Sequence, residues 1–168
     1  IPASWFQSIN PLLIILLGFY VSAFWIFLSK KNFLCSSIFK ISTGLIIMGT
    51  GFIFMYFASV ESSNFGKSSM YWLLLAYLFH TVGELCASPI ILSYITKLSP
   101  KKIIASVMGI YFATIGLGNK LAGTIGQYSD NLGEKTVFLG IFFVCLITGF
   151  VTIFFQKRLK RLSHGLDN

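Results

Sequence analysis

Long apolar runs alternate with short polar breaks along the whole chain. The runs cover residues 5–28, 41–59, 71–96, 103–127 and 137–155. Each run reaches or nearly reaches the roughly 20 residues that an α-helix needs to cross a bilayer, whereas the strands of a membrane barrel are about half as long. The pattern predicts an all-α membrane protein with five transmembrane helices.

The charged residues lie mainly in the breaks, and the character of the breaks alternates. The first and third breaks are basic, through Lys30, Lys31, Lys40, Lys97, Lys101 and Lys102. The second and fourth breaks mix acidic and basic residues, and the tail 156–168 is basic. Because basic loops stay in the cytoplasm, we expect a multi-pass membrane protein with its N-terminus outside and its tail in the cytoplasm.

The composition agrees with a membrane protein. Of the 168 residues, 55% are hydrophobic and 11% are charged, against about 25% charged in soluble domains. The net charge of +8 does not indicate a nucleic-acid partner, because the basic residues are spread over the breaks instead of forming one patch. Three cysteines match no metal-site spacing, and no nucleophile–base pair indicates an enzyme. We therefore expect the lipid bilayer as a partner, and neither a metal nor another cofactor.

Glu84 is the only charged residue between Lys67 and Lys97. An acidic residue at the centre of a membrane helix costs about 2.5–3.5 kcal/mol on insertion scales, so it usually serves a proton, an ion or a substrate amine. His80, Glu84 and Ser88 are spaced four residues apart and predict a polar face against a water-filled cavity. The alternative for His80 and Ser88 is hydrogen bonding between helices. A carboxyl group in a cavity can exchange a proton for a cationic ligand, which makes Glu84 and His80 the proton-coupling candidates.

Other runs contribute further candidates. Asn10, directly before Pro11, brings a donor and an acceptor into apolar surroundings, or it simply marks the ragged start of a helix. Tyr111 and its neighbour Phe112 could line a pocket, or face lipid or the core. Five glycines predict close helix approach in the fourth run, for gating or for static packing: Gly109, Gly116, Gly118, Gly123 and Gly126.

Three segments carry a family resemblance: Phe-Gln-Ser-Ile-Asn-Pro at 6–11, Gly-Glu-Leu at 83–85 with Ser-Pro at 88–89, and Met-Gly-Ile-Tyr-Phe at 108–112 followed by Gly118-Asn119 and Gly123. In order and spacing they resemble the proton-dependent oligopeptide transporter family, a branch of the major facilitator superfamily. The resemblance covers nearly the whole chain and corresponds to the eighth to twelfth spans of that fold. It implies that residues 1–168 are a C-terminal helical bundle fragment.

The resemblance also implies roles at matching positions. Glu84 would contact the amino terminus of a bound peptide, Asn10 would help to bind the same amine, and Ser88 matches the serine one turn after the glutamate. Tyr111 stands where the family usually has tryptophan, which keeps an aromatic wall and changes the pocket size.

The implied function is proton-coupled symport of di- and tripeptides across a bacterial-type inner membrane, driven by the proton gradient. Its partners would be a short peptide, protons and the N-terminal half of the same transporter, which we expect to be missing from this chain. Two alternatives remain open: a related carrier for another amine-bearing solute, and a non-transporting membrane scaffold subunit.

Overall fold

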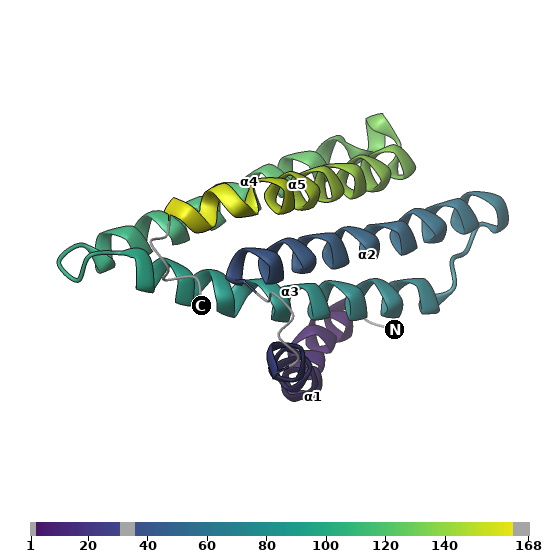
Figure 1. Cartoon of the computed structure of the whole chain (residues 1–168). Coiled ribbons are helices and arrows are strands. Elements are labelled where there is room, and N and C mark those ends of the chain that lie inside the picture. The colour runs from purple at the N-terminus through teal and green to yellow at the C-terminus, as the bar shows by residue number, and fades with distance from the viewer. Residues whose placement is uncertain (1–2, 31–35, 163–168) are drawn as a thin grey trace.

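Five long helices joined by short connections make up the described part of the chain (Figure 1). The computed structural model describes residues 3–30 and 36–162. The helices are α1 (Ala3–Lys30), α2 (Ser37–Phe65), α3 (Met70–Leu98), α4 (Ile104–Leu132) and α5 (Glu134–Leu162). Each is long and apolar enough to cross a membrane, which confirms the predicted all-α fold with five membrane-length helices.

The helices extend beyond the apolar runs because capping groups set their ends. The side chain of Ser36 accepts a hydrogen bond of 3.2 Å from the Phe39 amide at the start of α2. Gly66, at a φ of 70°, closes the other end by donating its N–H to the Ser62 carbonyl oxygen at 2.8 Å. Helix α5 likewise continues to Leu162, so the first residues of the expected basic tail are helical. Residues 163–168 of that tail lie outside the described residues.

Helix α2 is the centre of the bundle. It packs along α3 on one side and along α5 on the other, while α1 packs on α3 and α4 lies next to α5 (Figure 1). Gly44 of α2 and Gly83 of α3 allow the backbones of these two helices to come into contact. A Cβ atom on Gly83 would lie only 2.6 Å from the Gly44 carbonyl oxygen. On the α5 side, Ser42 Oγ and Thr152 Oγ1 lie 2.8 Å apart. The tightest packing therefore surrounds α2.

Helix α4 differs from α2 in having few neighbours. None of the residues in its membrane-length window is buried. A Cβ atom on any of the five α4 glycines would meet nothing within 4 Å. The close approach expected from these glycines is therefore not made among the described residues, although Gly118 and Gly126 line a cavity together with Phe52 of α2 and Phe138 of α5.

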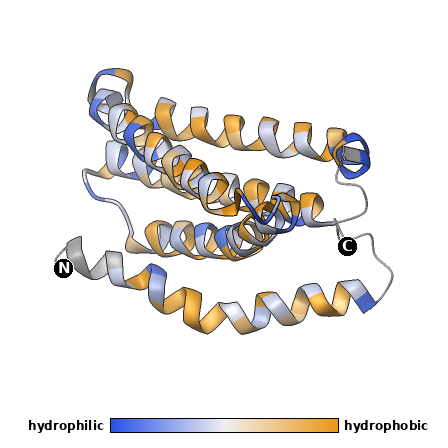
Figure 2. Ribbon diagram, turned by 90° about the vertical axis from the view of Figure 1, so that its left-hand side faces the viewer, coloured by the Kyte–Doolittle hydropathy of each residue, from blue (hydrophilic) through white to orange (hydrophobic). Residues whose placement is uncertain are grey.

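Apolar side chains cover the outside of the bundle, as a hydrocarbon environment requires. Large exposed examples include Phe19 on α1, Ile110 on α4 and Phe154 on α5. Figure 2 shows hydrophobic residues along the helices and hydrophilic residues gathered at their ends and connections. The same surface would be an aggregation hazard in water.

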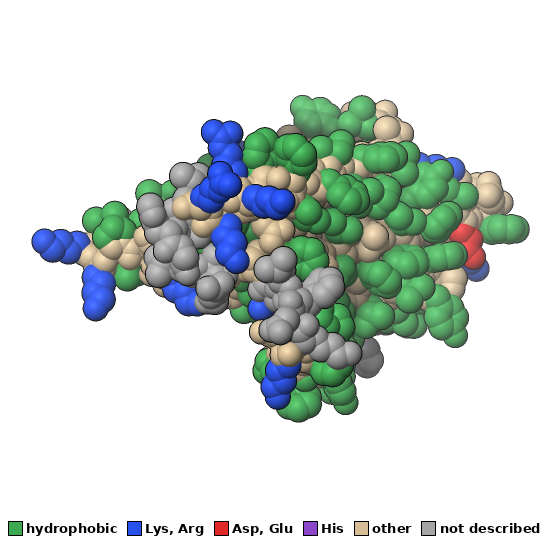
Figure 3. Space-filling model, in the orientation of Figure 1, with side chains coloured by type: hydrophobic (Ala, Val, Ile, Leu, Met, Phe, Trp, Pro, Cys, Tyr) green, Lys and Arg blue, Asp and Glu red, His purple; other side chains and the backbone are tan. Residues whose placement is uncertain are grey.

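Charge separates the two ends of the bundle. One end of the bundle is formed by the end of α1, the start of α2, the α3–α4 connection and the end of α5. It carries most of the described basic side chains: Lys30, Lys40, Lys97, Lys101, Lys102, Lys157, Arg158, Lys160 and Arg161. We call it the basic end, and Figure 3 shows Lys and Arg gathered there. The opposite end carries Glu61 and Glu134 together with Lys67 and Lys135.

Candidate functional site

A small polar network joins α1 to α3 inside the apolar bundle. The Thr81 hydroxyl lies 2.6 Å from Asn10 Oδ1, and Asn10 Nδ2 donates to Glu84 Oε2 over 3.5 Å. Thr81 Oγ1 also lies 2.8 Å from the carbonyl oxygen of Tyr77, one turn earlier. The single hydroxyl hydrogen of Thr81 therefore faces two acceptors.

Local sequence explains why these groups meet. Thr81 and Glu84 are three residues apart on α3, so they are neighbours on one side of that helix. Asn10 approaches this side from α1, directly before Pro11, which is held inside the helix. Thr81 was not among the site residues predicted from the sequence, and its three-residue spacing from Glu84 was the signal that could have identified it.

Burial and contact distances differ among the three residues of the network. Thr81 has no exposed surface, while Glu84 and Asn10 are half-buried. The short contact with Thr81 anchors the Asn10 amide, whereas the long contact leaves the Glu84 carboxylate loosely held. A carboxylate offers about four lone-pair positions, so Glu84 keeps the capacity to accept further N–H donors. This arrangement suits a cationic ligand that carries several N–H groups.

His80 faces a different helix from Glu84. Its ring lies 4.6 Å from the Phe52 ring between centroids, and a Cβ atom on Gly51 would lie 2.6 Å from His80 Nε2. That buried nitrogen has no hydrogen-bond partner among the described residues. The ring lines a cavity of about 200 Å³ together with Tyr77 and Phe138.

The prediction that His80, Glu84 and Ser88 share one polar face is therefore wrong. At 3.6 residues per turn, each four-residue step rotates the side chain by about 40°, so the three positions drift around the helix. As a result His80 meets α2 while Glu84 meets α1.

Ser88 and Tyr111 are not joined to the network. Ser88 is exposed one turn beyond Glu84, and among the described residues it forms no hydrogen bond. Tyr111 is half-buried on α4, where its ring lies 5.4 Å from that of Phe112. Within residues 3–30 and 36–162, no group of three or more His, Cys, Asp or Glu side chains is placed to hold a metal ion. The structure thus brings Asn10 and Glu84 together and leaves Ser88 and Tyr111 apart from them.

Comparisons with known proteins agree on one family. A family model described as the POT family matches residues 1–148. The peptide transporter YePEPT of Yersinia enterocolitica is 40% identical over 98% of this chain, which covers 33% of that relative. A di-/tripeptide transporter of Lactococcus lactis subsp. cremoris is 27% identical over 96% of the chain, which covers 32% of that relative.

Solved structures give the same result. The crystal structure of a peptide transporter POT in complex with sulfate matches 94% of this chain with a TM-score of 0.84 and 30% identity, and the chain covers 32% of it. A POT family transporter in complex with a thioalcohol-conjugated peptide matches 90% of the chain with a TM-score of 0.78 and 28% identity, over 31% of its own length. The chain spans about a third of the length of these relatives. With a family model over most of its length and helices arranged as in the solved transporters, the chain belongs to the POT family.

Proposed function

We propose that this chain forms the C-terminal part of a proton-coupled symporter of di- and tripeptides. The observation that carries the proposal is the contact between Asn10 and Glu84 across α1 and α3. It places a carboxylate with free acceptor capacity inside an apolar bundle, at the junction of two helices that pack on each other. The N-terminal amine of a peptide is a cation with three N–H donors and matches that carboxylate.

Each residue of the network has a separate role in this proposal. Glu84 accepts N–H groups of the substrate ammonium, and Asn10, whose amide is anchored by Thr81, helps to bind the same ammonium. In a symporter the proton and the peptide cross the membrane in the same direction, so both must be bound in the loaded carrier. Glu84 is one proton-coupling candidate, because a carboxyl group binds protons and ammonium groups alike. His80 is the second proton-coupling candidate, because its buried Nε2 is available to a proton or a water molecule.

The remaining site residues have supporting roles. Ser88, one turn beyond Glu84, and Tyr111 on α4 shape the pocket for the rest of the peptide. The N-terminal part of the transporter supplies the opposite wall, because alternating access requires two halves around a shared site.

The charge distribution supports a location and an orientation. The basic end of the bundle lies in the cytoplasm by the positive-inside rule, which puts the tail inside and residue 1 outside. The bacterial relatives support the inner membrane as the location.

The names of relatives support peptides as the substrate class, since the Yersinia and Lactococcus proteins are called peptide and di-/tripeptide transporters. One solved POT family transporter instead holds 5-aminolevulinic acid, at a TM-score of 0.78 and 28% identity. That ligand also carries an amine, so it favours a carrier of another amine-bearing solute as the second candidate function.

The test uses a chimera in which this chain replaces the matching third of the Yersinia relative. Labelled dipeptide uptake into proteoliposomes is measured under an imposed pH gradient. Loss of a hydrogen bond to a charged group costs about 1.5–3 kcal/mol, so Glu84→Gln should lower uptake by about 10- to 100-fold. Glu61→Gln is the matched control, because Glu61 bonds Trp72 and the Ser69 amide at the opposite end of the bundle.

Three results would contradict the proposal. Unchanged uptake and pH dependence in Glu84→Gln would remove the proposed role of the carboxylate. A lower amount of assembled protein with unchanged uptake per molecule would favour a scaffold. Competition by free amino acids but not by dipeptides would favour the carrier of another solute.

A further inference from the structure

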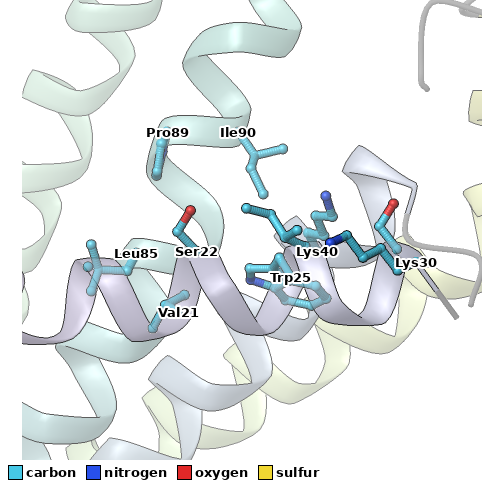
Figure 4. A pocket seen from close by; sticks show the side chains of 11 residues that line it. Val21, Ser22, Trp25, Lys30, Lys40, Leu85, Pro89 and Ile90 are labelled. Atoms are coloured by element: carbon cyan, nitrogen blue, oxygen red, sulfur yellow. The ribbon is translucent and has the colours of Figure 1, made fainter.

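A cavity of about 470 Å³ lies between α1, α2 and α3 at the basic end of the bundle (Figure 4). Figure 4 shows Lys30, Lys40 and Trp25 at one end of it, with Val21, Leu85 and Pro89 toward the other. Neither Asn10 nor Glu84 lines this cavity. It is therefore a feature separate from the polar network.

The charged residues that line the cavity are all basic among those described. Its described lining includes two lysines and no acidic residue. Lys40 Nζ lies 5.6 Å from the centroid of the Trp25 ring, a cation–π distance that holds the ammonium at the mouth. Lys30 is exposed at the last turn of α1. Two cations at one mouth create a site for an anion such as a phosphate group.

Apart from Ser22 and Ser29, the rest of the lining consists of apolar residues and Gly18. Ile26, which lines the cavity, is 56% exposed, so the cavity adjoins the exposed apolar surface of α1. Leu85, Pro89 and Ile90 of α3 form the opposite wall. The volume corresponds to roughly 15 water molecules at about 30 Å³ each, so a free phosphate ion would leave most of the space empty. An amphiphile with an anionic head and an apolar chain fills both parts.

We propose that this cavity binds an anionic phospholipid from the leaflet at the basic end. The lipid phosphate lies between Lys30 and Lys40, near the hydroxyl of Ser29, and one acyl chain lies along Val21 and Leu85. Both lysines sit at helix ends, the depth at which basic pockets between membrane helices meet lipid headgroups.

The test titrates the full chain in a non-ionic detergent with phosphatidylglycerol, and with phosphatidylcholine of the same acyl chains, and counts bound lipids by native mass spectrometry. A basic residue near a membrane surface contributes about fivefold in affinity, so Lys30→Gln with Lys40→Gln should weaken phosphatidylglycerol binding by about 25-fold. Lys67→Gln is the matched control: an exposed lysine at the opposite end, whose replacement should leave binding unchanged. Ser22→Phe fills the apolar part of the cavity and should also displace the lipid.

Several outcomes would overturn the proposal. Equal affinity for the two lipids would remove the role of the headgroup charge, and equal weakening by Lys67→Gln would show a general charge effect. Displacement of the lipid by millimolar inorganic phosphate would show an anion site without a lipid. Unchanged binding in Ser22→Phe would exclude the acyl chain from the cavity. Lys30→Gln alone, at an exposed position, keeps the fold intact and should still give about a fivefold loss.

Discussion

Replacing Gly83 by alanine would force α2 and α3 apart at their closest point. The new Cβ atom would lie 2.6 Å from the Gly44 carbonyl oxygen and 2.8 Å from the Met48 amide nitrogen, and it would also overlap Met48 Cγ. The methionine side chain can rotate away. The two backbone atoms cannot, so the helices themselves must move.

The size of the effect follows from these distances. Ordinary van der Waals contact begins at 3.4 Å, so the gap to the Gly44 oxygen must grow from 2.6 Å to at least that value. Overpacking a well-packed interior costs about 1–3 kcal/mol. Because Gly83 contacts backbone in the most tightly packed interface of the bundle, we expect a loss near 3 kcal/mol. For a chain of this size, that loss lowers the unfolding temperature by about 6–12 °C.

The assay is thermal unfolding of the full chain in detergent, followed by far-UV circular dichroism at one fixed scan rate. Gly116→Ala on α4 is the matched control, because a Cβ atom there meets nothing within 4 Å. Alanine is favoured over glycine in a helix by about 1 kcal/mol, so this variant should melt at or slightly above the parent. Parent-like melting of Gly83→Ala, or an equal fall in both variants, would refute the reasoning.

Three further predictions concern the polar and aromatic contacts. Thr81→Val removes the hydroxyl that contacts Asn10 Oδ1 and should lower the free energy of unfolding by about 0.6–1.7 kcal/mol in the same assay. As a control, the same substitution in a protein that already carries Asn10→Ala should cause no loss. Gly51→Ala drives a methyl group into the His80 ring and should lower the unfolding temperature, and adding His80→Ala should restore part of it; additive losses would contradict this contact. Trp72→Phe removes a 2.6 Å hydrogen bond to the Glu61 carboxylate of α2 and should lower the free energy of unfolding by about 1.5–3 kcal/mol. Trp25→Phe is the comparison in the same assay, because among the described residues Trp25 has no hydrogen bond to a carboxylate.

Hydropathy predicted the number and type of the helices because a membrane helix must be apolar over most of its length. It did not predict where they end. Helix α2 begins at the Ser36 cap and ends before Gly66, well outside the predicted run 41–59. Hydropathy follows the hydrocarbon boundary, whereas a helix continues until its backbone groups find another partner.

Glycine content alone did not predict where the helices pack most closely. Among the described residues, a Cβ atom on a glycine of α4 would meet nothing within 4 Å, while Gly44 and Gly83 bring α2 and α3 together. A glycine permits close approach, but the partner helix decides whether the approach occurs. That choice depends on how the helices are ordered in space, which the residues of one helix do not encode.

The candidate site was likewise predictable from the sequence only in part. Glu84 and Asn10 were recognisable as polar groups in apolar runs, and the structure places them 3.5 Å apart. The anchoring by Thr81 and the turn of His80 toward α2 depend on how α1 and α2 pack on α3. The roles of Ser88 and Tyr111 as pocket residues stay predictions.

Gly133 is the whole connection between α4 and α5, and its φ of 81° favours glycine at that point. One residue spans at most about 3.5 Å, so α4 cannot slide along α5. It can only swing about that point. Its 29 residues give it a length of about 43 Å, and a rotation of 10° would move the far end by about 8 Å. The five residues between α3 and α4 span up to about 17 Å, which is long enough to follow this movement. The tight turn at Gly133 therefore allows α4 to rotate as a unit against α5, α2 and α3, which pack closely on each other.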